Sequence, residues 1–202
     1  MKFILGQKQN MTQVFDEKGE VFPVTVIKTS PNVITQVKTK AKDGYEALQV
    51  GFGSKKAKNI NKAQKGHFKD LGNFAFLREF QTNEAKNVGD KLELSQFAIG
   101  DKVVVSAISK GKGFQGVVKR HGFKGGPRTH GQKHSEREPG SISGGVRNGG
   151  RVPKGMRMAG RMGGDLITVK NLKVVQVDAE LGEILIKGAV PGRRGTLVEI
   201  KG

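Results

Sequence analysis

The sequence contains no cysteine and no tryptophan, and it has one tyrosine among 202 residues. Without cysteine the chain can form no disulfide, thiolate metal site or cysteine nucleophile. Long apolar runs are also missing, because a stretch such as residues 103–105 is far shorter than the roughly 20 residues that span a bilayer. Residues 1–8 lack the apolar region of a secretory signal. We therefore expect a cytoplasmic protein.

Acidic residues are scarce as well. The chain has 18 Asp and Glu against 36 Lys and Arg, which gives a formal net charge of +18 and a pI of about 10.2. Hydrophobic residues make up 35% of the sequence, whereas glycine is frequent with 30 residues. Repulsion among so many like charges opposes compaction, and a polyanionic partner relieves it. The composition therefore indicates a polyanion as the partner.

The positive charge is concentrated in residues 110–165. This segment holds thirteen Lys or Arg, three acidic residues and sixteen of the glycines. Large apolar residues are few, so the segment can hardly offset its ordering entropy by itself. A solvated loop is the simpler interpretation, but surfaces usually mix charges of both signs. We interpret the segment as an extended arm that becomes ordered on a partner.

The composition of the arm favours RNA over DNA. Arginine forks bind phosphates in pairs and stack on bases, and glycines let a backbone approach crowded phosphates. Sequence-specific DNA readers usually present a helix or ribbon to the major groove, and the glycines of this segment interrupt such elements. We expect thirteen cations to contact RNA, with His130 joining by stacking. They are Lys110, Lys112, Lys119, Arg120, Lys124, Arg128, Lys133, Arg137, Arg147, Arg151, Lys154, Arg157 and Arg161. Arg193 and Arg194, in a later turn, are weaker candidates.

The flanks of the arm predict a mainly β scaffold. Short runs rich in β-branched and apolar residues are separated by turn formers such as Ser30-Pro31-Asn32 and Asp43-Gly44. Six or more short strands of this kind favour a small barrel or a sandwich. The predicted strands are residues 21–27, 33–37, 45–52, 102–108, 166–177, 183–187 and 196–200.

We expect one domain, residues 1–202, with two insertions. The core comes from residues 1–54, 94–109 and 166–202, and residues 110–165 form the arm. Residues 55–93 form a mixed, partly helical insertion. In it Asn61 can cap a short helix that ends at Gly72.

Three patterns in the arm resemble catalytic or ligand-binding motifs. Residues 111–116 spell GxGxxG after a strand, but later glycines would break the helix that a dinucleotide site needs. His130 and His134 have metal-ligand spacing without supporting carboxylates, and Ser135 beside His134 has no acid placed to orient that His. We therefore expect no enzyme activity, cofactor, metal or small-molecule substrate. A nucleotide-dependent enzyme using residues 111–116 and a general nucleic-acid-packaging protein remain alternatives.

Motifs from one end of the chain to the other resemble the universal large-subunit ribosomal protein L-three family, in its shorter bacterial form. Near the N-terminus they are Met1-Lys2-Phe3-Ile4-Leu5-Gly6, Met11-Thr12-Gln13-Val14-Phe15, Phe22-Pro23-Val24-Thr25-Val26, Asp43-Gly44-Tyr45-Glu46-Ala47, Gly66-His67-Phe68 and Leu77-Arg78-Glu79-Phe80. The arm and the C-terminal part add Ser109-Lys110-Gly111-Lys112-Gly113-Phe114-Gln115-Gly116, Thr129-His130-Gly131, Pro139-Gly140-Ser141-Ile142, Met158-Ala159-Gly160-Arg161-Met162-Gly163 and Lys187-Gly188-Ala189-Val190-Pro191-Gly192.

The resemblance implies a six-stranded translation-protein-type β-barrel with a long extension. It also implies a structural constituent of the large ribosomal subunit that binds 23S rRNA near its 3′ end and helps to nucleate assembly. The extension would reach towards the peptidyl-transferase centre, with residues 141–153 near its tip. The ribosomal protein families L-fourteen and L-nineteen are the neighbours it implies.

The sequence departs from the family pattern at a few places. Ser143-Gly144-Gly145 stands where the family has Gly-Gln, so Gly144 occupies the position of a glutamine that some bacteria methylate, and we expect no modification there. Arg120-His121-Gly122-Phe123 replaces the common Arg-Trp-Asn-Phe and removes an aromatic residue. Asn10 replaces a usual glycine. We expect altered contacts at these places and an unchanged role.

Overall fold

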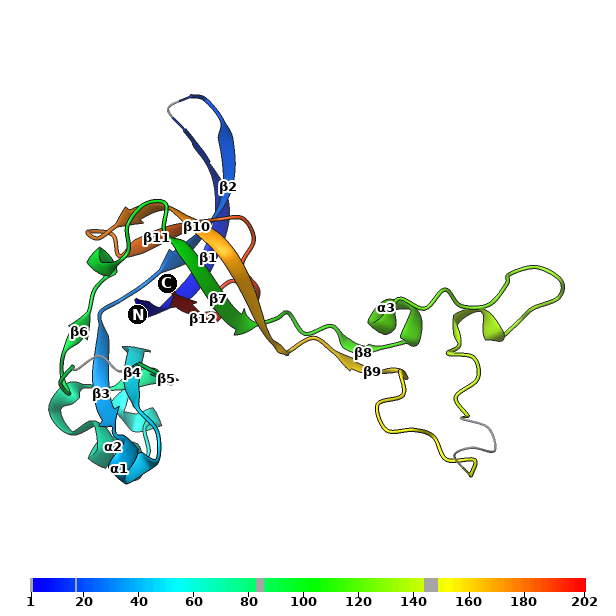
Figure 1. The fold of residues 1–202 in the computed structure, drawn as a ribbon, viewed down its shortest axis with the longest axis horizontal. Helices are drawn as coiled ribbons and strands as arrows, with labels where there is room; N and C mark the ends of the chain where they lie inside the picture. The colour runs from blue at the N-terminus through cyan, green and yellow to red at the C-terminus, as the bar shows by residue number, and fades with distance from the viewer. Residues whose placement is uncertain (1, 17, 83–85, 144–148) are drawn as a thin grey trace. The chain divides into compact units, whose positions relative to one another are not determined.

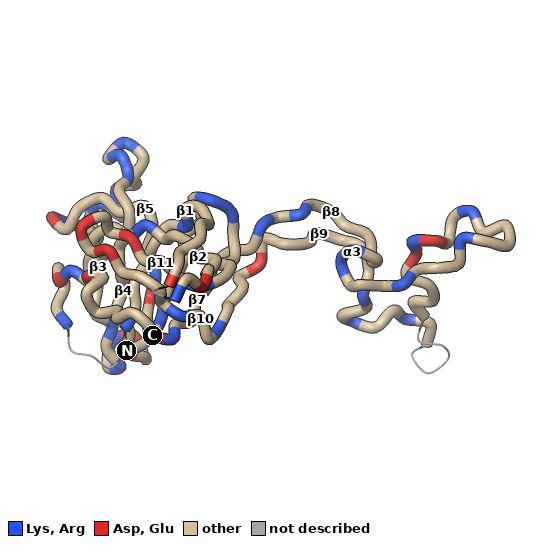
Figure 2. The backbone as a smooth tube through the Cα atoms, turned by 90° about the horizontal axis from the view of Figure 1, so that it is seen from above, with Lys and Arg blue, Asp and Glu red and all other residues tan. Residues whose placement is uncertain are grey.

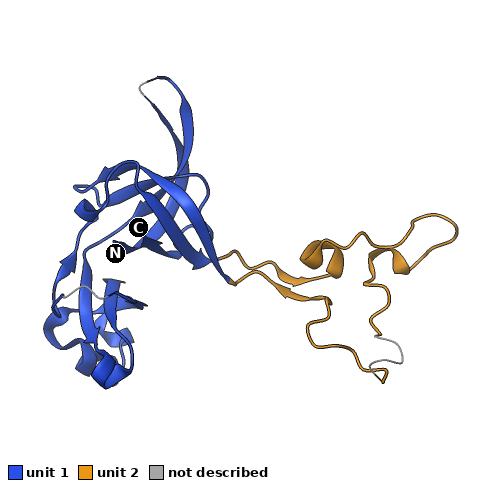
Figure 3. Cartoon of the chain, in the orientation of Figure 1, with its two compact units in different colours: residues 1–108, 166–202 blue, residues 109–165 orange. Residues whose placement is uncertain are grey.

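The computed structural model describes residues 2–16, 18–82, 86–143 and 149–202. The chain forms two compact units, which Figure 3 distinguishes by colour. The first unit comprises residues 1–108 and 166–202, and the second comprises residues 109–165. Among the described residues no helix is long and apolar enough to cross a bilayer.

Six antiparallel strands of the first unit pair in a closed order (Figure 1). They are β1 (Phe3–Phe15), β2 (Val21–Lys28), β7 (Lys102–Ile108), β10 (Leu166–Asp178), β11 (Glu183–Lys187) and β12 (Leu197–Lys201). Each strand pairs with the next in the order β1-β12-β7-β10-β11-β2, and β2 returns to pair with β1. Since β2 and β1 complete the order, the closed sheet leaves no strand at an unpaired edge.

Alternating side chains of these strands form the core of the closed sheet. In β7, Val103, Val105 and Ala107 are buried, while Val104 and Ser106 between them are half-buried. This alternation follows from the period of two in a strand, which sends successive side chains to opposite faces. The buried cluster comprises Ile4, Ile27, Leu94, Phe97, Val103, Val105, Ala107, Val174, Ile184, Ile186, Val190, Val198 and Ile200.

A four-stranded sheet in the same unit has the order β5-β4-β3-β6. Its strands are β3 (Asn32–Lys38), β4 (Ala47–Ser54), β5 (Phe74–Phe80) and β6 (Lys91–Leu92). A second apolar cluster covers it, made of Phe3, Leu5, Ile34, Leu48, Val50, Phe52, Phe80 and Leu92. Strand β1 serves both cores, because Ile4 lies in the first cluster whereas its neighbours Phe3 and Leu5 lie in the second.

The helices of the first unit are short. Helix α1 (Lys40–Asp43) ends at Gly44, which has a φ of 81°. Helix α2 (Lys62–Phe68) begins as predicted, since the Asn61 side chain accepts a hydrogen bond from Gln64 N at 2.7 Å. The 3-10 turns of this unit are Ala57–Asn59, Lys69–Leu71 and Leu94–Gln96.

The second unit is built around a small ribbon. Strand β8 (Gly113–Gln115) pairs with β9 (Gly160–Met162), with Phe114 opposite Arg161. Helix α3 (Val117–His121) follows β8, and a 3-10 turn covers Ser135–Arg137.

The mainly β class expected from the sequence is confirmed by these sheets. One assignment differs: the sequence predicts that residues 1–54 form one core with residues 94–109 and 166–202, but β3 and β4 pair in the separate four-stranded sheet. The reason is that local β-propensity marks a strand without identifying its partner. The strand predicted for residues 45–52 begins at Ala47, after the turn that Gly44 makes.

Candidate nucleic-acid interface

The base of the second unit is an antiparallel ribbon held by backbone hydrogen bonds. Ser109 N donates to Asp165 O at 2.9 Å, and Lys112 N donates to Met162 O at 2.9 Å. Gly163 has a φ of 75°, and a Cβ added there would lie 2.2 Å from Lys110 O. Only glycine fits this approach of the two backbones. The ribbon therefore fixes where the cations on its two strands emerge.

Helix α3 presents basic residues in its last turn. It ends at Gly122, which adopts a φ of 73° and donates to Val118 O at 3.0 Å. Arg120 Nη1 donates to Met158 O at 2.7 Å, and His121 Nε2 lies 3.0 Å from the same oxygen. Arg120 is therefore half-buried and connects α3 to the chain before β9. Arg120 is thus a predicted RNA-contact residue whose guanidinium already donates a hydrogen bond within the protein, to Met158 O.

A glycine-rich turn lies against the 3-10 turn of the same unit. Gly126 N donates to Glu136 O at 3.0 Å, and a Cβ added to Gly125 would lie 2.1 Å from that oxygen. Across this contact Arg128 Nε lies 2.6 Å from Glu136 Oε1, with the Arg128 side chain 80% exposed. An ion pair this exposed contributes little to stability, so a phosphate can replace the carboxylate as the partner of Arg128.

The remaining predicted contact residues in the second unit are exposed. This holds for Lys110, Lys112, Lys119, Lys124, Arg128, His130, Lys133, Arg137, Arg151, Lys154, Arg157 and Arg161. Arg147 and Gly144 lie outside the described residues. Figure 2 shows Lys and Arg recurring along residues 109–165, with few acidic positions between them. Lys and Arg are charged at neutral pH, so this unit offers a row of accessible cations.

The ligand-site alternatives lack the expected geometry. After the GxGxxG residues, α3 has five residues, and β8 pairs antiparallel with β9, which is not the strand–helix–strand context of a dinucleotide site. Ser135 Oγ donates to Gln132 Oε1 at 2.6 Å and so has no base partner in His134. In the part of the chain that the structure describes, no three His, Cys, Asp or Glu residues are grouped to hold a metal.

A basic surface of the first unit was missed at the sequence level. Residues 55–69 contain six lysines and no acid, and this run of like charge was the available signal. The structure leaves five of these lysines exposed around α2, namely Lys56, Lys58, Lys62, Lys65 and Lys69. Ile60 and Phe68, both buried, anchor the segment beneath them. We call these five residues the lysine face.

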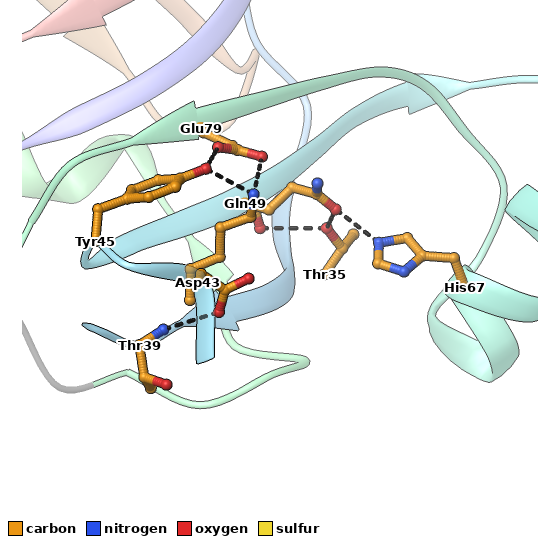
Figure 4. A network of polar contacts seen from close by, with 8 residues as sticks. Thr35, Thr39, Asp43, Tyr45, Gln49, His67 and Glu79 are labelled. Carbon is orange, nitrogen blue, oxygen red and sulfur yellow. Dashed lines mark hydrogen bonds and ion pairs between the residues drawn. The ribbon is translucent and has the colours of Figure 1, made fainter. Parts of the chain in front are cut away.

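A network of polar side chains joins α2 to the four-stranded sheet (Figure 4). Gln49 Oε1 accepts from Thr35 Oγ1 at 2.8 Å and lies 2.7 Å from His67 Nε2, which ties α2 to strands β3 and β4.

On the same sheet, a carboxylate, a phenol and an ammonium group meet. Lys38 Nζ lies 2.8 Å from Glu79 Oε1, and the hydroxyl of Tyr45 donates to Glu79 Oε2 at 2.7 Å. The hydrogen bond from Lys38, followed by that from Tyr45, lowers the pKa of Glu79. The same hydrogen bond to Glu79 raises the pKa of Lys38. Both groups are therefore charged at neutral pH.

Known proteins match the sequence of this chain across both units. A family model described as Ribosomal protein L3 matches residues 69–183, more than half of the chain and all of the second unit. The chain is 54% identical over 200 residues to Large ribosomal subunit protein uL3 of Herpetosiphon aurantiacus, covering 98% of this chain and 94% of that protein. It is 52% identical over 202 residues to the uL3 protein of Streptococcus pyogenes serotype M1, covering 99% and 96%. With the uL3 protein of Streptomyces avermitilis it shares 50% identity over 205 residues, covering 100% and 95%.

Proposed function

This chain belongs to the ribosomal protein L3 family, and on that premise we propose that it is a non-enzymatic structural constituent of the large ribosomal subunit that binds 23S rRNA. Family membership makes it a large-subunit ribosomal protein that takes part in translation on the cytoplasmic ribosome. The observation that carries the rRNA-binding proposal is the row of exposed cations on residues 109–165.

The proposed mechanism is electrostatic. Cations of the second unit neutralise phosphates and release condensed counterions, so affinity falls steeply with salt. If about 6–10 phosphates are contacted, raising salt from about 50 to 200 mM weakens binding by ~10³–10⁵-fold. Val117 is the buried core residue of this unit in the described part of the chain. Because so little apolar packing orders the unit, we propose that rRNA completes its ordering and couples this step to subunit assembly.

The two units have different proposed roles. We propose that residues 110–165 are an rRNA-binding arm carried by one domain, and that they extend towards the peptidyl-transferase centre. The closed sheet of the first unit is proposed to be the translation-protein-type barrel, which binds 23S rRNA near its 3′ end and helps to nucleate assembly. Proteins of the L-fourteen and L-nineteen families are its proposed neighbours.

The first test is mass spectrometry of large subunits purified from the source cells after washing in high salt. The proposal predicts that the chain remains in equimolar amount with the other large-subunit proteins. If it washes away entirely or never co-purifies, the proposed role is wrong. In that case saturable binding of NAD(H) or ATP would support the enzyme alternative, and equal affinity for duplex DNA and rRNA at matched salt would support nucleic-acid packaging.

A second test addresses the arm itself. Replacing Arg147, Arg151 and Arg157 together with alanine is expected to leave thermal unfolding of the first unit nearly unchanged, because none of them belongs to that unit. Subunit assembly or translation is expected to be impaired, because three phosphate-binding groups are lost. The matched control replaces the same three residues with lysine, which keeps the charge and removes the guanidinium fork. Normal assembly and translation in the alanine variant would contradict the arm's role.

A further inference from the structure

Phe114 is unusually accessible for an aromatic residue. The residue is 77% exposed, more than any other large hydrophobic residue in the described part of the chain. The other phenylalanine of the second unit, Phe123, is half-buried, and its ring lies 6.0 Å from that of His121. Phe123 therefore packs within the unit, whereas the ring of Phe114 faces solvent.

The ribbon holds this ring in a defined position. Phe114 lies directly opposite Arg161 in the antiparallel pairing of β8 with β9. Residues opposite each other in such a pair point to the same face, so the ring and the guanidinium emerge side by side. Glycines at positions 111, 113 and 116 flank the ring along the strand, and a Cβ added to any of them would meet nothing within 4 Å. A flat partner can therefore reach the ring without displacing neighbouring side chains.

The charges around Phe114 identify the chemistry of the partner. Lys110, Lys112 and Arg161 are exposed on the same ribbon, neither β8 nor β9 contains an acidic residue, and Asp165 lies at the base of the ribbon. An apolar protein surface would gain nothing from these three cations, whereas RNA supplies both phosphates for the cations and flat bases for the ring. Charge complementarity thus favours RNA over a protein partner.

We propose that Phe114 stacks on an unpaired base of the RNA that the second unit binds, while Arg161 binds a phosphate beside that base. This inference rests on the proposed rRNA binding. It adds an aromatic residue to the proposed RNA contacts, which otherwise consist of cations and His130. Stacking of this kind tolerates any base, because every base has a π-face. The ribbon therefore recognises an unstacked nucleotide rather than a particular sequence.

The affinity of the full chain for 23S rRNA provides the first test. Replacing Phe114 with alanine is expected to weaken binding by about 5- to 150-fold, the range that loss of one aromatic–base stack gives. The salt dependence of binding should not change, because no charge is removed. Phe114→Tyr keeps the ring and is expected to bind like the wild type. Leu181→Ala, at an exposed apolar position of the first unit, controls for truncation of a surface side chain. Unchanged affinity of Phe114→Ala would overturn the proposal.

The absence of tryptophan from the sequence allows a direct optical test. Phe114→Trp introduces a single indole whose fluorescence is quenched when it stacks on a base. We expect quenching by 23S rRNA but not by inorganic polyphosphate, which has the charge of a nucleic acid without its bases. Leu181→Trp, at an exposed position outside the ribbon, is the matched control, and rRNA should quench it less than Phe114→Trp. Equal responses to rRNA and polyphosphate, or no response of Phe114→Trp to rRNA, would overturn the proposal. The partner of the ring would then be a protein surface.

These outcomes separate this inference from the proposed function. If the wild-type chain fails to bind 23S rRNA, the proposed function itself fails. If the wild type binds and Phe114→Ala binds equally well, rRNA binding stands and base stacking by Phe114 is wrong.

Discussion

The side chain of Asn32 forms two hydrogen bonds with the backbone of Leu5. Asn32 Oδ1 accepts from Leu5 N at 2.9 Å, and Asn32 Nδ2 donates to Leu5 O at 3.0 Å. Both residues are fully buried. Asn32 begins β3 of the four-stranded sheet, whereas Leu5 belongs to β1 of the closed sheet. One amide side chain thus takes the place of a neighbouring strand and joins the two sheets.

Replacing Asn32 with alanine is expected to destabilise the first unit by about 2–6 kcal/mol, since it leaves the buried N–H and C=O of Leu5 unpaired at roughly 1–3 kcal/mol each. Urea unfolding followed by circular dichroism measures the change. Asn59→Ala, at an exposed position, is the matched control and should change stability by less than about 0.5 kcal/mol. A loss no larger in Asn32→Ala than in this control would show that the bridge contributes nothing.

Asn32 also marks the limit of what could be predicted from the sequence. Its neighbours Ser30 and Pro31 predict a turn, but residues 29–31 form an irregular connection between β2 and β3, and the hydrogen bonds of the Asn32 side chain to Leu5 join residues that are 27 positions apart. Local propensity contains no signal for such a partner. Strands β7 and β11 were predicted with their observed bounds, because alternation and turn residues are local features. Strand β5 was placed inside a mixed insertion, because its partner β4 supplies the pairing that makes it a strand.

In the candidate interface, too, local features could be predicted from the sequence and long-range contacts could not. The exposure of the cations on the second unit could be predicted, because Lys and Arg are seldom buried without partners. The hydrogen bond from Arg120 to Met158 could not, since the two residues are 38 positions apart. The exposure of Phe114 was also missed, because an aromatic residue in a strand normally packs on a neighbouring layer, and this ribbon has two strands only.

Acid is expected to destabilise the first unit partly through Glu79. Its pKa in the folded state is lowered from the usual 4.5 by the hydrogen bonds from Lys38 and Tyr45. A lowered pKa contributes stability above the unfolded value, and that contribution is lost as the pH falls through the folded value. Glu79→Gln should therefore be less stable than the wild type at pH 7, and the difference should shrink as the pH falls below 4.5.

Urea unfolding from neutral pH down to the acid limit of the folded state tests the role of Glu79. Glu180→Gln, in an exposed turn, controls for the loss of one negative charge. A difference between wild type and Glu79→Gln that stays constant with pH would contradict the linkage.

The glycine at the base of the ribbon gives a steric prediction. Gly163→Ala would place a Cβ 2.2 Å from Lys110 O, so the two strands must separate there. We expect faster hydrogen exchange at the Lys112 amide, which donates to Met162 O, together with weaker binding to 23S rRNA. Gly155→Ala is the matched control, because Gly155 also has a positive φ of 81° but has open space around it. If both variants behave alike, backbone strain and not the close approach is the cause.

The ion pair between Arg128 and Glu136 predicts opposite effects of its two partners on RNA affinity. Arg128→Ala removes a cation, so binding to 23S rRNA should weaken, and the slope of log K against log salt should become shallower by about 0.9.

Glu136→Gln releases Arg128 from its carboxylate and also removes a charge that repels phosphate. Exposed pairs are worth about 0.2–1 kcal/mol, so affinity should rise by about 1.4- to 5-fold. The backbone bond from Gly126 to Glu136 O is kept in this variant, so the turn should stay intact. Glu138→Gln removes a neighbouring exposed charge and measures the repulsion alone. If Glu136→Gln binds no more tightly than Glu138→Gln, Arg128 does not exchange its carboxylate for a phosphate, and it should be removed from the proposed contacts.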